Sequence, residues 1–285
     1  MPARRLDDWL PVEDEAGFGS FAPTRLQGVI LTLGRVVRFR GFLRKRLAML
    51  VHWLRPAPID VSLAGLKLRL YLTNNACERR FAMEQNRYDG HEIGAIADVL
   101  ARHESPLFVD IGANIGLFSL LVAKAVPNAK ILAIEPNPNL YRRLCFNLSL
   151  NRPHNIKPLA CGVGEKQGKA MLHFTNNNAG QATLAETVSD KGGISVAIYP
   201  LHELIAQNAA KTPFVALKLD VEGYEDRIII PFLEHVPDNG LPAIIVMEHR
   251  WRERWRRNAL EICAQRGYDE VSRDKDNLIL IRKDS

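Results

Sequence analysis

The sequence predicts an α/β protein, with a mostly parallel sheet of roughly seven strands and helices on both faces. Two observations carry this prediction. From about Leu107 onward, short and nearly continuous apolar segments alternate with helical segments, which is typical of a parallel sheet buried on both faces. The last two apolar segments, near Tyr268–Val271 and Leu278–Ile281, follow one another closely, so we expect them to close the sheet as a hairpin.

The apolar segments give the expected strands. These are Leu107–Ile111, Lys130–Ile134, Asn155–Leu159, Phe214–Leu219, Ala243–Met247, Tyr268–Val271 and Leu278–Ile281. The expected helices are Gly116–Val126, Pro138–Leu150, Pro200–Gln207, Tyr224–His235 and Arg252–Arg266. Between Gly168 and Ile198 we expect further short strands and an Asn-rich loop, Asn176–Gln181, which is a candidate gate of the substrate site.

Residues 1–58 are expected to form a loosely ordered arm followed by two basic amphipathic helices. Apolar residues recur near helical spacing from Leu26 to Leu54, and Gly41 divides the pattern. Six cations between Arg35 and Arg46 would be costly in hydrocarbon, so these helices are not expected to span a membrane.

Residues 59–106 are expected to form a β-hairpin and a helical lead-in to the main domain, which covers residues 107–285. Apolar and polar residues alternate from Ile59 and again from Leu66, with Ala64 and Gly65 between them. The helical segment is expected at about Glu92–His103.

The charge distribution points to anionic partners. The net charge is +6, and the chain has no acidic residue between Ala16 and Ile59. The basic helices, residues 25–55, fit a cover of the active site or a homo-oligomer interface, an anionic membrane surface, or an acidic glycan substrate. Nucleic acid is disfavoured, because the basic segments have no interleaved aromatic residues on which bases would stack.

The cysteines and the N-terminus favour a reducing compartment. The four cysteines form no C-x-x-C pair, which argues against a disulfide framework or a zinc site. No apolar segment follows the N-terminal charges, so the N-terminus does not resemble a secretory signal. We therefore expect a cytoplasmic protein, with peripheral contact to the inner membrane surface as one possibility.

The strongest motif follows the first strand of the main domain, in Asp110-Ile-Gly-Ala-Asn-Ile-Gly. Gly112 and Gly116 allow a tight turn and the close approach of a ligand. Asn114 stands where a dinucleotide-binding loop has its middle glycine, which disfavours a nicotinamide dehydrogenase and favours a ligand with an amino-acid moiety. Asp110 at the end of the strand is a candidate to orient water or an ammonium group.

An acidic residue, Glu135, ends the second strand. In nucleoside-binding βαβ units an acid at this place accepts hydrogen bonds from the ribose hydroxyls. Its two carboxylate oxygens are both acceptors, which matches a vicinal diol. Glu135 is therefore a candidate ribose ligand.

Acidic residues also follow the strand Phe214–Leu219 and the next one. Asp220 and Glu222 are candidates for a general base, and Glu248 and His249 are expected nearby. Two close carboxylates raise one another's pKa or bind a divalent cation. The alternative is structural, because Glu222 and Glu225 also suit the N-terminus of the following helix.

Three strings together resemble the FkbM-type methyltransferase family: the Asp110–Gly116 motif, Glu135-Pro-Asn, and Lys218-Leu-Asp-Val-Glu-Gly-Tyr-Glu. The last string is the most specific, and the resemblance covers about Leu107 to Glu248. It implies a Rossmann-like class I methyltransferase fold with S-adenosylmethionine as cofactor. It also implies methyl transfer to hydroxyl oxygens of sugars and natural products.

The resemblance also implies roles for individual residues. The methionine part of the cofactor would lie among Asp110, Gly112, Asn114 and Gly116. Glu135 would hold the ribose, and the adenine side would be lined by Asn137, Cys161 and Gly162. For Cys161 a second interpretation stays open, because a free cysteine is usually a small buried apolar residue.

We therefore expect an S-adenosylmethionine-dependent O-methyltransferase that acts on a hydroxyl of a saccharide, glycolipid or secondary metabolite. Asp220 or Glu222 would serve as base or substrate anchor, with a divalent cation possible at the same place. Methylation of an amine is an alternative, although the chain lacks the Asn-Pro-Pro-Tyr type of motif. A cofactor-binding module without activity is another, and the intact acids argue against it.

Overall fold

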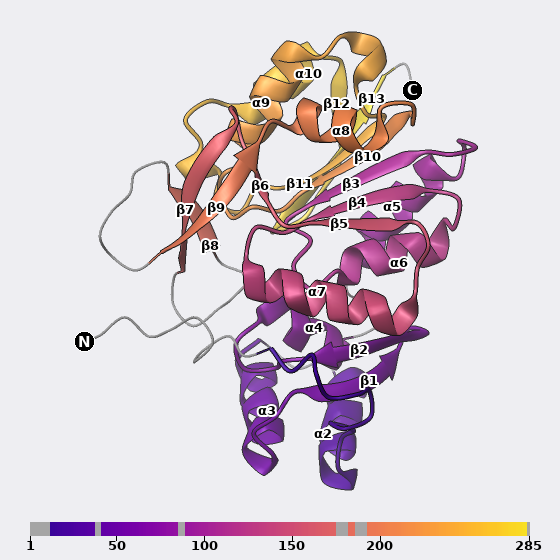
Figure 1. Cartoon of the computed structure of the whole chain (residues 1–285), viewed down its shortest axis with the longest axis vertical. Coiled ribbons are helices and arrows are strands. Elements are labelled where there is room, and N and C mark those ends of the chain that lie inside the picture. Colours follow the sequence, from indigo (N-terminus) through magenta and orange to yellow (C-terminus); the bar gives the residue numbers. More distant parts are fainter. Residues whose placement is uncertain (1–11, 38–40, 85–88, 175–181, 186–192, 284–285) are drawn as a thin grey trace.

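The central sheet of the protein has seven strands in the order β12-β13-β11-β10-β3-β4-β5 (Figure 1). The computed structural model describes residues 12–37, 41–84, 89–174, 182–185 and 193–283. The strands are β3 (Leu107–Ile111), β4 (Lys130–Ile134), β5 (Ile156–Leu159), β10 (Phe214–Leu219), β11 (Ile244–Glu248), β12 (Tyr268–Arg273) and β13 (Asn277–Arg282). The first five are parallel, and β12 and β13 close the sheet as an antiparallel hairpin. The predicted fold class is confirmed.

Helices cover both faces of this sheet. In Figure 1, α5, α6 and α7 lie on one face and α8, α9 and α10 on the other. These helices are α5 (Gly90–Leu100), α6 (Leu117–Ala125), α7 (Pro138–Asn151), α8 (Leu201–Ala209), α9 (Asp226–His235) and α10 (Ala259–Gln265). Successive strand residues point to opposite faces, so Phe108 packs with the α5–α6 side and Val109 with the α8–α9 side.

A smaller sheet of four strands, in the order β6-β9-β7-β8, lies beside the central one. Its strands are β6 (Gly162–Val163), β7 (Gly168–Phe174), β8 (Ala182–Ala185) and β9 (Ile194–Tyr199). The short strands predicted between Gly168 and Ile198 are therefore present. The predicted gating loop Asn176–Gln181 lies outside the described residues.

The N-terminal part forms the lower end of the molecule in Figure 1. It contains α2 (Arg25–Val36), α3 (Gly41–Leu54), the hairpin strands β1 (Ile59–Leu63) and β2 (Leu66–Leu70), and α4 (Ala76–Glu84). Both basic helices and the hairpin were expected from the sequence. Within the part of the chain that the structure describes, no helix has the length and hydrophobicity needed to cross a bilayer.

Helix α4 was not predicted, because its buried apolar residues are consecutive and show no helical period. They are Phe81, Ala82 and Met83. The residue that marks the start of the helix is Asn75, whose side-chain oxygen accepts the backbone N–H of Cys77 at 2.9 Å. This side chain stabilises the start of the helix by satisfying a backbone donor that has no partner within the helix.

The predicted helix Arg252–Arg266 was wrong in its first half. A short 3-10 helix, Arg252–Arg254, is followed by an irregular segment, and α10 begins only at Ala259. The carboxylate of Asp226 accepts the backbone N–H groups of Arg256 at 2.7 Å and Arg257 at 3.3 Å. A continuous helix would need these donors for its own hydrogen bonds, so the tertiary contact overrides the local preference.

Buried polar contacts join the N-terminal part to α7. The side chains of Arg143 and Glu78 form an ion pair of 2.7 Å, and each is at most 1% exposed. The amide oxygen of Asn147 accepts the backbone N–H of Arg69 at 2.9 Å. Arg69 also pairs with Asp60 on the neighbouring strand at 2.7 Å.

Candidate active site

The motif loop between β3 and α6 requires glycine at its close approaches. Gly112 has a φ of +81°, and a Cβ there would lie 2.0 Å from the carbonyl oxygen of Asp220. Gly116 has a φ of +79°, and Asn114, a residue type tolerated in this region, has a φ of +54°. The loop therefore lies directly against the end of β10, where Asp220 begins the acidic segment.

Asp110 is completely buried beneath this loop. Its Oδ2 accepts the hydroxyl of Ser119 at 2.7 Å, and its Oδ1 lies 3.3 Å from the Nζ of Lys218. Asp110 and Lys218 face one another in register on the neighbouring strands β3 and β10. Through these contacts Asp110 supports the loop from below, and its role in orienting a ligand stays a prediction.

Lys218 links the motif loop to the acidic segment. Its Nζ also lies 3.3 Å from the Oδ2 of Asp220. Burial alone would lower the pKa of Lys218, but the carboxylates of Asp110 and Asp220 raise it above its ordinary value. Lys218 therefore lies between two carboxylates.

Glu135 lies where the ribose ligand is expected, at the end of β4. Its Oε2 accepts the backbone N–H of Asn114 at 2.8 Å, and its Oε1 accepts that of Asn137 at 2.9 Å. Burial, with a smaller contribution from Asp110, raises the pKa of Glu135 to about 7. Each carboxylate oxygen has a second lone pair, so the side chain keeps the capacity to accept from a diol.

Three residues were expected on the adenine side. Asn137 caps α7, since its side-chain oxygen accepts the N–H of Asn139 at 3.0 Å; its Nδ2 is buried and has no hydrogen-bond partner among the described residues. Cys161 lies in the apolar core, and burial raises the pKa of its thiol to about 11. Gly162 pairs with Ile198 in the smaller sheet. The position of Cys161 favours the apolar interpretation of this residue.

Three acidic side chains converge at the ends of β10 and β11. Asp220, Glu222 and Glu248 each have a carboxylate oxygen within 4.8 Å of the others. Burial and the charge of Asp220 raise the pKa of Glu222 to about 7, and the same causes hold the pKa of Glu248 well above its usual range. Glu248 is 8% exposed, and its Oε2 has no hydrogen-bond partner among the described residues. These three side chains are called the acid cluster below.

Glu225 shapes the loop that carries the acid cluster. Its Oε1 accepts the backbone N–H groups of Val221 at 3.2 Å and Gly223 at 3.1 Å. Its Oε2 accepts the indole N–H of Trp255 at 2.8 Å. Glu225 precedes α9 directly, but its side chain caps no backbone N–H of that helix. It orders the preceding loop instead, in which Glu222 has a left-handed conformation with a φ of +56°.

His249 is not brought to the acid cluster, although it follows Glu248 directly. Its Nε2 lies 3.1 Å from the carbonyl oxygen of Asp274, in the turn between β12 and β13. A carbonyl is an acceptor, so this nitrogen carries the proton in the bond. The expected catalytic role of His249 gains no support from this position.

Two neighbours of the site could not be identified from the sequence. The amide of Asn75 donates to the Oδ1 of Asn114 at 2.7 Å and so holds the motif loop. Asp89 is largely buried near Lys218 and Asp220, and burial raises its pKa to about 6. Both residues come from the segment before the main domain, where no motif marks them.

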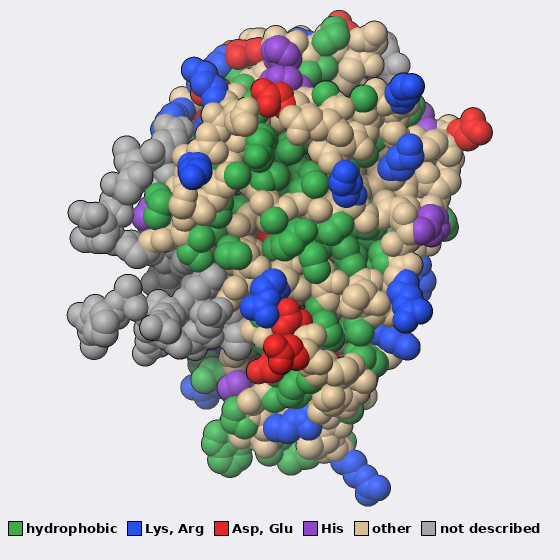
Figure 2. Space-filling view, in the orientation of Figure 1, with side chains coloured by type: hydrophobic (Ala, Val, Ile, Leu, Met, Phe, Trp, Pro, Cys, Tyr) green, Lys and Arg blue, Asp and Glu red, His purple; other side chains and the backbone are tan. Residues whose placement is uncertain are grey.

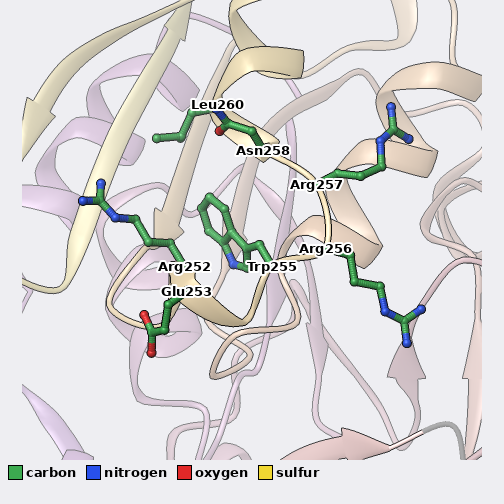
Figure 3. A pocket seen from close by; sticks show the side chains of 7 residues that line it. All are labelled: Arg252, Glu253, Trp255, Arg256, Arg257, Asn258 and Leu260. Atoms are coloured by element: carbon green, nitrogen blue, oxygen red, sulfur yellow. The ribbon is translucent and has the colours of Figure 1, made fainter.

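The arginine-rich segment after β11 forms a hollow of about 550 Å³ that is separate from the acid cluster (Figure 3). None of the three acids lines it. Figure 3 shows the guanidinium groups of Arg252, Arg256 and Arg257 pointing away from one another around Trp255. These cations do not converge on a common point, so the hollow is not built to hold a single anion.

Two curated relatives are methyltransferases by name. Methyltransferase sdnD of Sordaria araneosa is 41% identical over 158 residues, which cover 53% of this chain and 58% of that protein. Methyltransferase 1 of Beauveria bassiana is 27% identical over 146 residues, 45% of this chain and 59% of that protein. The matches thus span less than two thirds of either relative. A solved structure, M. jannaschii TYW2 in complex with AdoMet, has a TM-score of 0.40 at 16% identity and covers 79% of this chain and 87% of that one.

The family comparison covers both the motif loop and the acid cluster. The model described as the methyltransferase FkbM domain matches residues 110–270, more than half of the 285-residue chain. The match begins at Asp110 in the motif loop and ends in β12, so it includes the acid cluster. On this match, and as the motifs predicted, the chain belongs to the methyltransferase FkbM domain family.

Proposed function

We propose that the protein is an S-adenosylmethionine-dependent O-methyltransferase acting on a hydroxyl of a saccharide, glycolipid or secondary metabolite. The observation that carries this proposal is the position of the acid cluster directly beside the motif loop. Lys218 bridges Asp110 below the loop and Asp220 in the cluster, with 3.3 Å to each carboxylate. Cofactor loop and proton acceptors therefore share one edge of the sheet, where open α/β sheets bind ligands.

The residues around the motif loop fit the cofactor. Gly112 lets the loop lie against the end of β10, and Glu135 keeps acceptor capacity for the two ribose hydroxyls. The Nδ2 of Asn137 is a buried donor without a partner among the described residues, which suits a nitrogen acceptor of adenine. Glu135 and Asn137 would thus hold the nucleoside, and the loop would lie against the methionine part.

The acid cluster supplies a proton acceptor. Bound S-adenosylmethionine offers a methyl group that an oxygen nucleophile can take. An alcohol must give up its proton as its oxygen forms the new bond to carbon, and a base with a pKa near the working pH is best suited to receive it. Glu222, whose pKa burial and Asp220 raise to about 7, meets this condition. Asp220, paired with Lys218, is suited to anchor a second hydroxyl of the acceptor.

A divalent cation is a second candidate role for the acid cluster. The carboxylate oxygens lie within 4.8 Å of one another, and the Oε2 of Glu248 is buried without a partner among the described residues. Mg²⁺ prefers such oxygen ligands and tolerates further oxygens from an acceptor diol. Titrating Mg²⁺ alone into wild type and Glu248→Gln by calorimetry tests this role. A heat of binding that is present in wild type and lost in the variant supports the cation site. If neither protein shows a heat of binding, the acids keep only their role as bases.

Cofactor binding is the first test. Calorimetry with S-adenosylmethionine and NADH should show binding of the first ligand only. In Glu135→Gln the affinity should fall about 10- to 100-fold, because charged acceptor bonds to the diol are replaced by weaker neutral ones. The matched control Glu234→Gln changes an exposed glutamate near the end of α9 and should bind as wild type. Binding of NADH, or of neither ligand, would contradict the proposal.

The acceptor class is tested by product formation. Release of S-adenosylhomocysteine should be stimulated by saccharide, glycolipid or polyol acceptors and not by amines. Glu222→Gln should lower the rate about 10²- to 10⁴-fold with unchanged cofactor affinity, as expected for loss of a general base. The control Glu253→Gln, at an exposed position, should retain activity. Stimulation by amines alone would favour N-methylation. If no acceptor stimulates release, the protein would be a cofactor-binding module without activity.

A further inference from the structure

Helix α2 exposes an apolar stripe to solvent. Leu26 and Val29 are 55% and 56% exposed, and Leu33 and Val36 continue the stripe at spacings of four and three residues. Such spacing places all four side chains on one face of a helix. A second face, with Ile30 and Leu31, packs into the core. The helix is therefore apolar on two faces, and packing within the chain uses only one of them.

Helix α3 exposes a second stripe of the same kind. Phe42, Met49 and Trp53 repeat at spacings of seven and four residues, and Trp53 is 76% exposed. Leu43 and Leu50 extend this stripe, while Ala48 and Val51 are buried. Helices α2 and α3 contact one another, so the two stripes belong to one structural unit.

This concentration of exposed apolar side chains is specific to the helix pair. Eleven large hydrophobic side chains are exposed in the described part of the chain, and ten of them lie between Leu26 and Trp53. The other, Val271, is on β12. Single exposed hydrophobic residues are ordinary, but a gathering of this kind marks an interaction surface. Figure 2 shows hydrophobic and basic side chains together at this lower end of the molecule.

The charge of the helix pair selects the partner. Residues 16–59 contain no Asp or Glu, and Arg25, Lys45 and Arg46 are exposed on the two helices. The guanidinium of Arg46 lies 4.4 Å from the centre of the Phe42 ring, so cationic and apolar groups alternate closely on α3. A second copy of this surface would bring like charges together, which disfavours a self-complementary dimer. A partner surface that is anionic and partly apolar would match both the positive charge and the exposed apolar side chains of the helix pair.

We propose that α2 and α3 dock the protein on an anionic lipid bilayer. The helices lie in the plane of the interface, with the apolar stripes at the boundary between headgroups and acyl chains. Lys45, Arg46 and Arg25 contact the lipid phosphates, as basic amphipathic helices do. If the proposed function holds, this docking favours a glycolipid among the acceptors. The docking itself requires neither cofactor nor activity, so the two proposals fail separately.

Vesicle flotation with the full chain tests the docking. Without cofactor, the protein should float with vesicles of phosphatidylcholine and phosphatidylglycerol, and much less with phosphatidylcholine alone. Added salt should weaken the binding, because the cationic contribution is screened. Equal binding to both vesicle types, or binding to neither, would overturn the proposal.

Matched variants separate the surface from net charge. Lys45→Glu with Arg46→Glu should lower partitioning about 20-fold or more, since each cation at an anionic surface changes it about fivefold. The control, Lys166→Glu with Lys211→Glu, makes the same charge change at exposed lysines outside the helix pair and should bind as wild type. An equal loss in both pairs would reduce the effect to net charge and contradict a specific surface.

Two further measurements examine the apolar stripes. Brominated lipids should quench a tryptophan signal in wild type, and Trp53→Phe should remove most of this quenching while the protein still floats. Val29→Ser with Trp53→Ser should abolish flotation, whereas Val271→Ser should not. If light scattering instead shows a dimer that Val29→Ser with Trp53→Ser dissociates, and no vesicle binding occurs, the surface is an interface between copies and the proposal is wrong.

Discussion

The edge of the central sheet and the α2–α3 pair depart from the usual distribution of residues in opposite directions. At the sheet edge, ionisable side chains such as Asp110, Lys218 and Glu248 are buried. On the helix pair, large apolar side chains such as Val29 and Trp53 are exposed. Asp110 and Lys218 are paired with one another inside the chain, while Val29 and Trp53 are more than half exposed and lie outside the core. The first arrangement is typical of a catalytic or ligand-binding site, and the second is typical of an interaction surface.

The largest expected effect is at Lys218. Lys218→Met removes the cation between Asp110 and Asp220 and leaves the fully buried Asp110 without a counter-charge. The free energy of unfolding should fall by about 3–5 kcal/mol, as when one partner of a buried ion pair is removed. Denaturant unfolding measures this loss. Lys166→Met, at an exposed lysine, should change stability little, and equal stability of both variants would show that the bridge is dispensable.

A glycine in each region gives the next contrast. Gly112→Ala forces a side chain into a left-handed conformation and towards the Asp220 carbonyl, so stability should fall by at least about 2 kcal/mol. Gly28→Ala in α2 meets no atom within 4 Å and should stabilise by about 0.5–1 kcal/mol through helix propensity. Thermal unfolding distinguishes the two. Similar changes in both variants would contradict the close approach at Gly112.

The pH dependence of stability should also differ between the regions. Because burial raises the pKa of Glu135 to about 7, the folded protein binds more protons than the unfolded chain between about pH 5 and 7. The free energy of unfolding should therefore fall as pH rises through this range, by about 2–3 kcal/mol for this group. Glu135→Gln should flatten that slope, and an unchanged slope would argue against the raised pKa.

Asp60 on β1, in the N-terminal part, should give a pH dependence of stability with the opposite sign. Burial opposes ionisation of Asp60, but Arg69 and the backbone N–H groups of Phe21 and Gly19 lower its pKa below the ordinary value. Its contribution to stability is present above the unfolded pKa of 3.8 and is lost as pH falls through the lower folded value. The Glu135→Gln variant should leave this acid limb unchanged.

The smallest effect is expected on the helix pair itself. Val29→Ser with Trp53→Ser should change the free energy of unfolding by no more than about 0.5 kcal/mol, because neither side chain packs into the core. Leu31→Ala, at a buried position of α2, should cost about 2–5 kcal/mol. Urea titrations of the three proteins check this. A large loss in the surface variant would mean that the stripes stabilise the fold rather than await a partner.

The sequence predicted the sheet well and its surroundings less well. The bounds of β3, β4 and β10 are those expected, since each is a buried apolar run ended by a breaker or an acid. Helix α4 was missed because its start depends on one capping residue, Asn75, and its buried residues show no helical periodicity. The late start of α10 was missed because it depends on a tertiary contact, in which the Asp226 carboxylate accepts the backbone N–H of Arg256.

For the candidate site, too, some residues could be predicted from the sequence and others could not. The convergence of Asp220 and Glu222 with Glu248 was expected, because the carboxyl ends of neighbouring parallel strands meet at one edge. His249 turns away because successive residues of a strand point in opposite directions. Asn75 could not be found, since its contact with Asn114 spans 39 residues of sequence and a lone asparagine forms no motif.

The ion pair of Arg143 with Glu78 bears on where the protein can be divided. A fragment starting at Leu107 would keep every motif of the family, yet α7 would carry a buried guanidinium whose carboxylate partner had been cut away. The same cut removes Asn75, so the motif loop would lose a neighbour that holds it. We therefore expect the unit that folds to extend beyond the segment matched by the family, and a minimal domain to begin no later than the hairpin at Ile59.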